Sequence, residues 1–438
     1  MRQLAPEEAV RSFAEVNLGY SREEAVREAR RGGHADLGPA RRACPFGVDI
    51  PTLVASIARG DFDAAKAAVV QAHPWPEILG RWCIKHCERA HSLGEAVEPL
   101  FISALERAAG EHGSVPPLRF APAMNGKRVA VLGAGSAGSG AAFRLRQIGY
   151  EVVVYDRLPV FGGMMAMGYP EFRLPYSVVR RENDPADWFA DLCLEAEIDR
   201  ALFDRVRGEF DAVVIATGKV KEAKLGIPGE DLEGVWDALE VLRRVKLGRS
   251  CPLGEDVAVF GAGYTAQDAS RVARRLGRRV AIYYRRGIDE MPVSPRSRDR
   301  YILQQEREGA PYVFHVAPIR IVGRAGRVVG VACVRTEHGD LDASGRRAPL
   351  VVPDSEFVVD CDTVIVATGE QIDASFAPPE LELADGKIRV TDDFETSLPQ
   401  VYAVGSAAGF ESTDAAYSSG MRCAEVIDRQ LSLVGRGA

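Results

Sequence analysis

Long apolar runs are missing from this sequence of 438 residues. No stretch approaches the roughly 18 apolar residues that a membrane-spanning helix needs, and the first residues lack the apolar core of a signal peptide. Basic residues are not in excess either, since the net charge is −7. These absences argue against a membrane protein and against binding to nucleic acid or to an anionic membrane surface. We therefore expect a protein of the cytoplasm.

Cysteine is sparse, with eight residues in the whole chain. No Cys-x-x-Cys pair lies near the two glycine-rich motifs described below, which argues against a redox-active disulfide of the thioredoxin reductase kind. Five cysteines are scattered, and most are expected to be small apolar residues of the core. These are Cys193, Cys251, Cys333, Cys361 and Cys423. The other three, Cys44, Cys83 and Cys87, lie in the first quarter of the chain.

Two glycine-rich motifs stand out against this background. Gly-Ala-Gly-Ser-Ala-Gly at 133–138 follows the β-rich run 129–132, and Gly-Ala-Gly-Tyr-Thr-Ala at 261–266 follows the run 257–260. Each motif opens an amphipathic stretch that leads to a second β-rich run. This order predicts a dinucleotide-binding unit, because the glycines let the backbone approach a pyrophosphate at the helix N-terminus. The expected pyrophosphate-binding residues are Gly133, Gly135, Ser136, Ala137, Gly138, Gly261, Gly263, Tyr264, Thr265 and Ala266.

The end of the second strand in each unit indicates which nucleotide the unit binds. The first unit has Asp156 there, and a carboxylate accepts hydrogen bonds from an unmodified ribose. The second unit has Arg285 and Arg286, and two guanidinium groups suit a ribose that carries a 2′-phosphate. The second site is therefore predicted to bind NADP rather than NAD. The alternative is that both arginines are solvated surface residues.

Further glycines indicate that the dinucleotide of the first site is FAD. Gly163, shortly after the first unit, lets the chain pass close to a bulky ligand. A short β-rich run near the C-terminus ends at Gly405 and Ser406. Two similar runs, which end at Gly218 and Gly369, mark crossings between the two nucleotide domains. Together these features predict FAD at the first site and NADPH at the second.

The predicted fold class is α/β, with two Rossmann-like domains preceded by an α-helical domain. We place the helical domain at residues 1–118, the FAD domain at 126–250 and 363–438, and the NADPH domain, inserted in the FAD domain, at 251–362. Residues 321–360 alternate in places between apolar and polar and are expected to form antiparallel strands.

Four stretches of the sequence resemble a known family: residues 57–62, 80–88, 167–175 and 284–292. Over nearly its whole length the chain resembles the small subunit of bacterial NADPH-dependent glutamate synthase. Relatives of that subunit include the reductase portion of dihydropyrimidine dehydrogenase and the NADP-binding subunit of electron-bifurcating ferredoxin oxidoreductases. The resemblance implies a helical iron–sulfur domain, hydride transfer from NADPH to FAD, and passage of single electrons through iron–sulfur clusters to a partner subunit. A homo- or hetero-oligomer is therefore expected.

The same resemblance implies a set of residues around the flavin. The resemblance implies that the segment 170–175 forms one wall of the flavin site. Ser406 replaces an aspartate that usually bonds the ribityl chain, and Tyr264 replaces an acidic residue, where it would stack near the dinucleotide or restrict its access. Asp414 is expected either near the flavin pyrimidine edge or as an N-cap of the last helix. The cofactor-binding residues implied between the two glycine-rich motifs also include Arg157, Gly163, Met164 and Arg173.

The helical domain departs from the family in its cysteines. The family carries two cysteine groups for two 4Fe-4S clusters, whereas here the first group retains only Cys44, and Leu79 and His91 occupy two of the four positions in the second. Because an ordinary cluster requires four thiolates, the sequence predicts at most one metal centre, either a 4Fe-4S cluster or zinc. The alternative is a domain without metal. His86 is expected at the surface. The candidate ligands are Cys44, Cys83, Cys87 and His91.

Three functions are consistent with these features. The leading hypothesis is an NADPH-dependent FAD oxidoreductase that passes electrons to a partner protein or another acceptor. The second is a flavoenzyme that acts directly on a small molecule without an iron–sulfur relay. The third is a nucleotide-binding subunit without catalysis. No acid–base pair of the protein stands out, so no catalytic residue is predicted. This is consistent with a reaction whose chemistry is supplied by the flavin.

Overall fold

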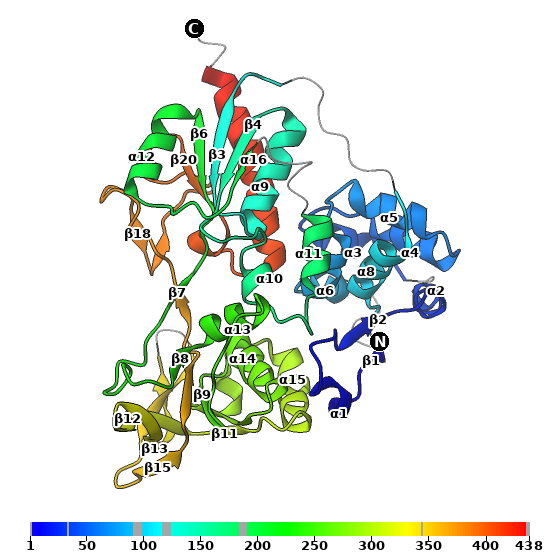
Figure 1. Ribbon diagram of the computed structural model, residues 1–438. Helices are drawn as coiled ribbons and strands as arrows, with labels where there is room; N and C mark the ends of the chain where they lie inside the picture. The colour runs from blue at the N-terminus through cyan, green and yellow to red at the C-terminus, as the bar shows by residue number, and fades with distance from the viewer. Residues whose placement is uncertain are drawn as a thin grey trace.

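The computed structural model describes residues 2–32, 35–90, 99–115, 124–183, 191–342 and 345–434. Two α/β units lie one above the other in Figure 1, and a helical domain packs beside them. The predicted α/β class, with a helical region ahead of two nucleotide-binding folds, is confirmed.

The helical domain is built from short helices around an apolar core that includes Leu53, Ile57 and Leu105. The Ser21 hydroxyl accepts a hydrogen bond from the N–H of Glu24, whose side chain caps in return, so α2 begins with a capping box. The helices are α2 (Arg22–Arg31), α3 (Gly38–Ala43), α4 (Ile50–Ala58), α5 (Phe62–Val70), α6 (Pro76–Trp82), α7 (His86–Ala90) and α8 (Ile102–His112). Ahead of them come β1 (Arg2–Gln3), α1 (Pro6–Ala9) and β2 (Asn17–Gly19).

The first α/β unit is a parallel sheet in the order β20-β6-β3-β4-β5. Its strands are β3 (Arg128–Leu132), β4 (Glu151–Tyr155), β5 (Asp191–Cys193), β6 (Ala212–Ile215) and β20 (Val401–Ala403). One face packs on α9 (Ser136–Ile148) and α16 (Thr413–Val434), the other on α12 (Arg200–Glu209). Smaller elements are α10 (Met164–Met167), α11 (Tyr176–Glu182), β18 (Leu383–Ala384), β19 (Lys387–Ile388) and η3 (Gly405–Ala408).

The helices α9 and α16 approach so closely that only glycine fits at their crossing. A Cβ on Gly140 would lie 2.3 Å from the carbonyl oxygen of Tyr417, and a Cβ on Gly420 would lie 2.1 Å from that of Ala137. This crossing fixes the start of α16 beside the first glycine loop.

The second unit is a parallel sheet in the order β11-β10-β9-β16-β8, covered on one face by helices and on the other by antiparallel strands. Its strands are β8 (Val235–Asp237), β9 (Asp256–Phe260), β10 (Arg279–Tyr284), β11 (Tyr312–Phe314) and β16 (Thr363–Val366). Its helices are α13 (Ala238–Lys246), α14 (Tyr264–Arg275), η2 (Ile288–Glu290) and α15 (Pro295–Arg307). The antiparallel strands are β12 (Val316–Arg324), β13 (Arg327–Leu341), β14 (Arg347–Val351) and β15 (Phe357–Asp360), in accord with the alternation seen in the sequence.

The predicted limits of the NADPH domain, 251 and 362, are too narrow. β8 and β16 both belong to the second sheet, because β16 pairs with β9 on one side and with β8 on the other. The chain crosses between the units on β7 (Lys221–Glu222) and β17 (Glu370–Gln371), which pair antiparallel. The second unit is therefore inserted into the first, but its sheet begins earlier and ends later than the apolar runs alone indicate.

Candidate dinucleotide and metal sites

The first glycine loop is shaped by contacts that exclude side chains. Gly133 has φ +114°, and a Cβ there would lie 2.4 Å from the carbonyl oxygen of Ala216. A Cβ on Gly138 would lie 1.8 Å from the carbonyl oxygen of Gly133. Gly135 precedes α9, whose first turn, starting at Ser136, has no side-chain cap. The first N–H groups of α9 are thus available to donate hydrogen bonds to an anion, and the loop fits a pyrophosphate.

Asp156 closes this loop from the neighbouring strand. Its two carboxylate oxygens accept the N–H of Ala134 at 2.7 Å and the N–H of Leu158 at 2.8 Å. Burial raises the pKa of this carboxyl, although both N–H groups oppose the shift. Each oxygen keeps a second lone pair, so the carboxylate can still accept a ribose hydroxyl. Arg157, next in sequence, is exposed.

Four of the predicted glycine positions surround the carboxyl end of the first sheet. A Cβ on Gly163 would lie 2.7 Å from Cα of Gly135, and one on Gly405 would lie 2.7 Å from Cβ of Ala137. Gly218 faces the Ser406 hydroxyl, which a Cβ would approach to 3.4 Å. Met164 opens α10 directly after Gly163.

A buried hydroxyl at this edge lacks a partner. Thr217, between β6 and Gly218, has its Oγ1 buried without a hydrogen-bond partner in the part of the chain that the structure describes. A polar ligand bound there would satisfy it. The residues present therefore fit FAD.

The second loop has the same backbone plan with different side chains. Gly261 has φ +139°, and a Cβ there would lie 2.1 Å from the carbonyl oxygen of Ala367. At Gly263 a Cβ would meet nothing closer than Pro292 at 3.8 Å, so the start of α14 is open to a ligand. The Thr265 hydroxyl donates to Glu370, next to Gly369, at 2.8 Å. The loop therefore also fits a pyrophosphate.

Tyr264 folds over the open side of this loop. Its hydroxyl accepts the N–H of Ser294 at 3.1 Å, and its ring meets that of Tyr301 edge-on, with centroids 5.6 Å apart. Ala266, two residues on, is fully buried. The tyrosine side chain is thus positioned beside the predicted dinucleotide path.

The two arginines after β10 have different surroundings. Arg286 is buried and donates to the carbonyl oxygen of Arg347 at 2.9 Å and to Asp342 at 2.6 Å, so it holds the β13–β14 hairpin. Arg285 is exposed, and partial burial together with the charges of Arg286 and Arg346 lowers its pKa. Positive charge is thus concentrated here, and Arg285 is the more accessible of the two arginines to a ligand.

Arg173 connects the two nucleotide domains. Its guanidinium donates to both carboxylate oxygens of Asp268 on α14, at 2.7 and 2.6 Å, and lies 4.3 Å from the ring of Trp82. Phe172 beside it is fully buried, and the guanidinium of Arg275 lies 3.9 Å from its ring. The segment 170–175 thus connects the two nucleotide domains, and its predicted contact with the flavin stays a prediction. Asp268 was not predicted from the sequence as a functional or structural partner. A carboxylate in the second turn of a buried helix nevertheless indicates that a charged partner is needed.

Asp414 is not the N-cap of the last helix, because the Ser412 hydroxyl fills that role by accepting the N–H of Ala415 at 3.3 Å. The N-cap alternative is therefore wrong. The fully buried Asp414 carboxylate instead accepts the N–H of Ile84 at 3.4 Å and lies 3.3 Å from Nε2 of His86. It joins α16 to the loop that carries the cysteines.

The three cysteines of the helical domain line one cavity, together with His73, His86 and Glu106. Burial raises the pKa of each of these thiols. His86, expected at the surface, is half-exposed and also reaches the cavity. The predicted fourth ligand, His91, lies outside the described residues. The three cysteines are Cys44, Cys83 and Cys87.

These residues do not fit two clusters. Two 4Fe-4S clusters need eight thiolates, and the domain has three cysteines. Over the described ranges, no group of three or more His, Cys, Asp and Glu side chains is arranged to hold a metal ion. A single centre would need movement of these side chains and a fourth ligand other than cysteine.

Comparisons with known proteins define the class. Residues 127–420 match the pyridine nucleotide-disulphide oxidoreductase family, and residues 9–114 match dihydropyrimidine dehydrogenase domain II, a 4Fe-4S cluster domain. The chain belongs to the pyridine nucleotide-disulphide oxidoreductase family. FAD and NADPH are the cofactors that this membership implies, and the N-terminal match implies a 4Fe-4S cluster.

The relatives narrow the class to NADPH-dependent flavin oxidoreductases of the glutamate synthase small-subunit kind, as the sequence predicted. The small chain of glutamate synthase [NADPH] from Halomonas elongata is 31% identical over 90% of this chain and 88% of its own length. The corresponding chain of Escherichia coli is 30% identical over 95% of this chain and 93% of its own length. The beta subunit of NADP(+)-dependent formate dehydrogenase from Moorella thermoacetica is 34% identical over 90% of this chain, which spans only 60% of that protein.

Solved structures support the fold. FprA from Mycobacterium tuberculosis superposes with a TM-score of 0.61 at 18% identity, covering 71% of this chain and 86% of FprA. Thioredoxin reductase of T. acidophilum gives a TM-score of 0.53 at 21% identity, covering 70% of this chain and 99% of the reductase. In the described part of the chain, no helix is both long and apolar enough to span a membrane.

Proposed function

We propose that this chain is the reductase subunit of a larger assembly, which oxidises NADPH and delivers the electrons to a partner protein. The observation that carries the proposal is the contact of Asp414 with Ile84 and His86. Asp414 lies in the first turn of α16, beside the predicted flavin site, whereas Ile84 and His86 stand between Cys83 and Cys87. One carboxylate thus links the flavin end of the FAD domain to the cysteine cavity.

The protein's part in the reaction is to bind and orient. Bound NADPH and FAD would supply hydride transfer. The two glycine loops would hold the pyrophosphates on the N–H groups of α9 and α14, and Arg285 would hold the 2′-phosphate. Asp156 would accept a hydrogen bond from the ribose of the first dinucleotide, and Thr217 and Ser406 would offer hydroxyl groups at the end of the sheet.

In the helical domain we propose a single centre on Cys44, Cys83 and Cys87. A histidine would complete it, either His91, as predicted, or His86 on the same cavity. Analysis of iron, sulfide and zinc, together with the visible spectrum, distinguishes three cases: a 4Fe-4S cluster, a zinc ion, or no metal.

A partner subunit is supported by the relatives, several of which are named as subunits or chains of larger enzymes. The identity of the partner, the oligomeric state and a cytoplasmic location stay predictions. The test is anaerobic addition of NADPH to the purified protein. NADPH should bleach the flavin band, and NADH should do so much more slowly. A protein that binds FAD but is not bleached by NADPH would contradict the proposal.

A second candidate is direct reduction of a small molecule by the flavin. It is favoured by the shortage of thiolates, since three cysteines cannot hold an ordinary cluster without another ligand. Metal-free protein that reduces a small acceptor as fast as it oxidises NADPH, with no partner present, would support this function over the first.

A further inference from the structure

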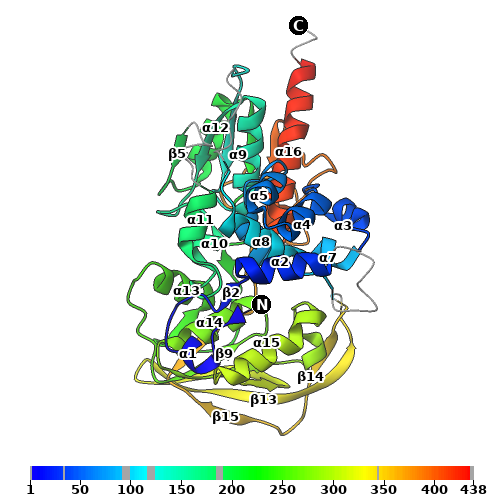
Figure 2. The ribbon, with the colours of Figure 1, turned by 90° about the vertical axis from the view of Figure 1, so that its right-hand side faces the viewer.

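The N-terminal residues 2–16, here called the strap, precede the helical domain in sequence, yet their apolar side chains pack against the NADPH domain. Ala9 and Val16 are buried in the apolar core formed by α13, α14 and the second sheet, and Leu4 and Phe13 pack against it. Figure 2 shows α1 beside α14, below the helical domain. The strap therefore leaves one domain to complete the core of another.

Hydrogen bonds fix the strap in this position. The N–H of Val16 donates to the carbonyl oxygen of Phe172 at 2.9 Å, and Nε of Arg275 donates to that of Ser12 at 3.1 Å. Phe13 and Phe172 lie with ring centroids 6.3 Å apart. The strap thus meets Phe172, in the FAD-domain segment that already reaches α14.

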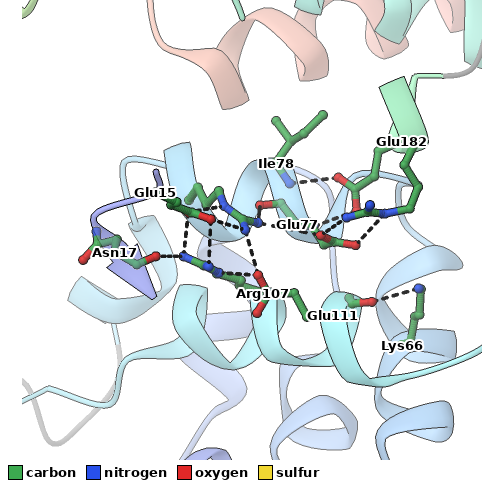
Figure 3. A network of polar contacts seen from close by, with 11 residues as sticks. Glu15, Asn17, Lys66, Glu77, Ile78, Arg107, Glu111 and Glu182 are labelled. Atoms are coloured by element: carbon green, nitrogen blue, oxygen red, sulfur yellow. Dashed lines mark hydrogen bonds and ion pairs between the residues drawn. The ribbon is translucent and has the colours of Figure 1, made fainter. Parts of the chain in front are cut away.

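The end of the strap is bound to the helical domain by buried charges (Figure 3). The Glu15 carboxylate accepts from Arg81 at 2.8 and 3.0 Å and lies 3.1 Å from Nη1 of Arg107. Both arginines also donate to Glu111, each at 2.7 Å. Such a network is costly to break, because removing one partner leaves charges unpaired in a poorly solvated place.

The same helix that carries Arg81 is fixed to the FAD domain. Glu182 on α11 accepts the N–H groups of Glu77 and Ile78, both at 2.8 Å, and Arg181 donates to Glu77 (Figure 3). A continuous set of contacts therefore runs from the NADPH domain through the strap and α6 to the FAD domain.

We propose that the strap positions the NADPH domain against the FAD domain, so that Phe13, Glu15 and Val16 are positioning residues for hydride transfer. The inference rests on the proposed function. In the described part of the chain, the polypeptide passes between the two domains at β7 and β17, so non-covalent contacts elsewhere contribute to fixing their relative position. Hydride transfer needs reacting atoms about 3–3.5 Å apart, and a misplacement of about 1 Å can cost up to about a hundredfold in rate.

The test compares Phe13→Ala/Val16→Ala with the parent protein in single-turnover reduction by NADPH, followed at the flavin band. We expect reduction slowed by about tenfold to hundredfold. FAD content and the affinity for NADP⁺, measured by calorimetry, should stay unchanged, because each nucleotide site lies within one domain. Leu18→Ala, a truncation of an exposed leucine just beyond the strap, is the matched control and should reduce at the parent rate.

A purely structural role would lower FAD content and the midpoint of thermal unfolding without a selective loss of rate. If the double variant fails to fold, Glu15→Gln gives the same readout, since it keeps every apolar contact and weakens only the attachment to Arg81 and Arg107. Parent-like reduction rates in these variants would overturn the inference. Failure of the parent protein itself to be reduced by NADPH would instead count against the proposed function.

Discussion

At the scale of single residues, Arg285 and Arg286 are neighbours in sequence with separate tasks. The exposed Arg285 is free to meet a phosphate, whereas the buried Arg286 is engaged by Asp342 and the backbone of Arg347. The local sequence contains two guanidinium groups, but only the three-dimensional setting shows that one is exposed and the other is held by the hairpin.

Substitution of each arginine separately tests this division. Arg285→Ala should raise the NADPH half-saturation by about tenfold to hundredfold, because charge-assisted bonds contribute about 1.5–3 kcal/mol each, and it should leave NADH nearly unaffected. Arg286→Ala should mainly lower the midpoint of thermal unfolding. Steady-state kinetics with both nucleotides and a thermal melt decide the matter, and equal kinetic effects of the two variants would contradict the assignment.

Glu222 gives a pH dependence of stability. Burial, then the hydrogen bond and charge of Asp237, raise its pKa from 4.5 to about 9. A carboxyl with a higher pKa in the folded chain binds its proton more tightly there, so its contribution to stability is present below pH 4.5 and is lost as the pH rises through about 9. Glu222→Gln should therefore flatten the fall in the thermal midpoint between pH 6 and pH 9.5. Glu8→Gln, at an exposed position, is the control, and parallel curves for all three proteins would refute the assignment.

At the scale of elements, the crossing of α9 and α16 places the start of α16 beside the first glycine loop. The contact depends on the absence of side chains at Gly140 and Gly420, whose added Cβ atoms would meet backbone oxygens. Backbone oxygens cannot move aside as flexible side chains do, so an extra methyl group must separate the helices.

Gly420→Ala should therefore destabilise the protein by about 1–3 kcal/mol and lower its FAD content. Gly208→Ala is the matched control. Gly208 lies in α12, and its added Cβ would meet nothing within 4 Å, so this change should stabilise by about 0.5–1 kcal/mol through helix propensity. Chemical denaturation of both variants measures the difference, and a Gly420→Ala protein as stable as the parent would show that the helices can separate freely.

The glycine loops were predictable from sequence because their chemistry is local, with strand, turn and helix following one another within about thirty residues. The limits of the NADPH domain were not, since β8 and β16 join the second sheet through pairings between residues far apart in the chain. The Arg173–Asp268 pair and the strap share this property. Apolar runs and charges indicate that a residue needs a partner, but not which distant segment supplies it.

At the scale of the whole molecule, the proposed metal ligands belong to the helical domain and the first proposed dinucleotide site belongs to the FAD domain. The three cysteines line a cavity formed by residues of the helical domain, whereas the first glycine loop opens α9 in the FAD domain. Loss of a metal ligand should therefore leave the flavin in place.

We expect Cys83→Ser to abolish any bound metal while FAD content stays at about one per chain. The parent protein, purified anaerobically, should contain at most one centre, because three cysteines cannot supply eight thiolates. Iron, zinc and sulfide analysis measures this, with Cys193→Ser as a control outside the cavity. About eight irons per chain would restore the two-cluster interpretation.

The antiparallel pairing of β7 with β17 brings the two ends of the inserted domain side by side. We therefore expect that residues 221–371 can be exchanged as a unit for an inserted domain of another coenzyme preference without lengthening either junction. The exchange carries one condition, because Leu4, Phe13 and Val16 of the recipient cover apolar surface on the native insert. A transplanted domain would need a matching apolar surface for these side chains, so we expect an exchange to succeed where that surface is kept or the first sixteen residues are transferred with the domain.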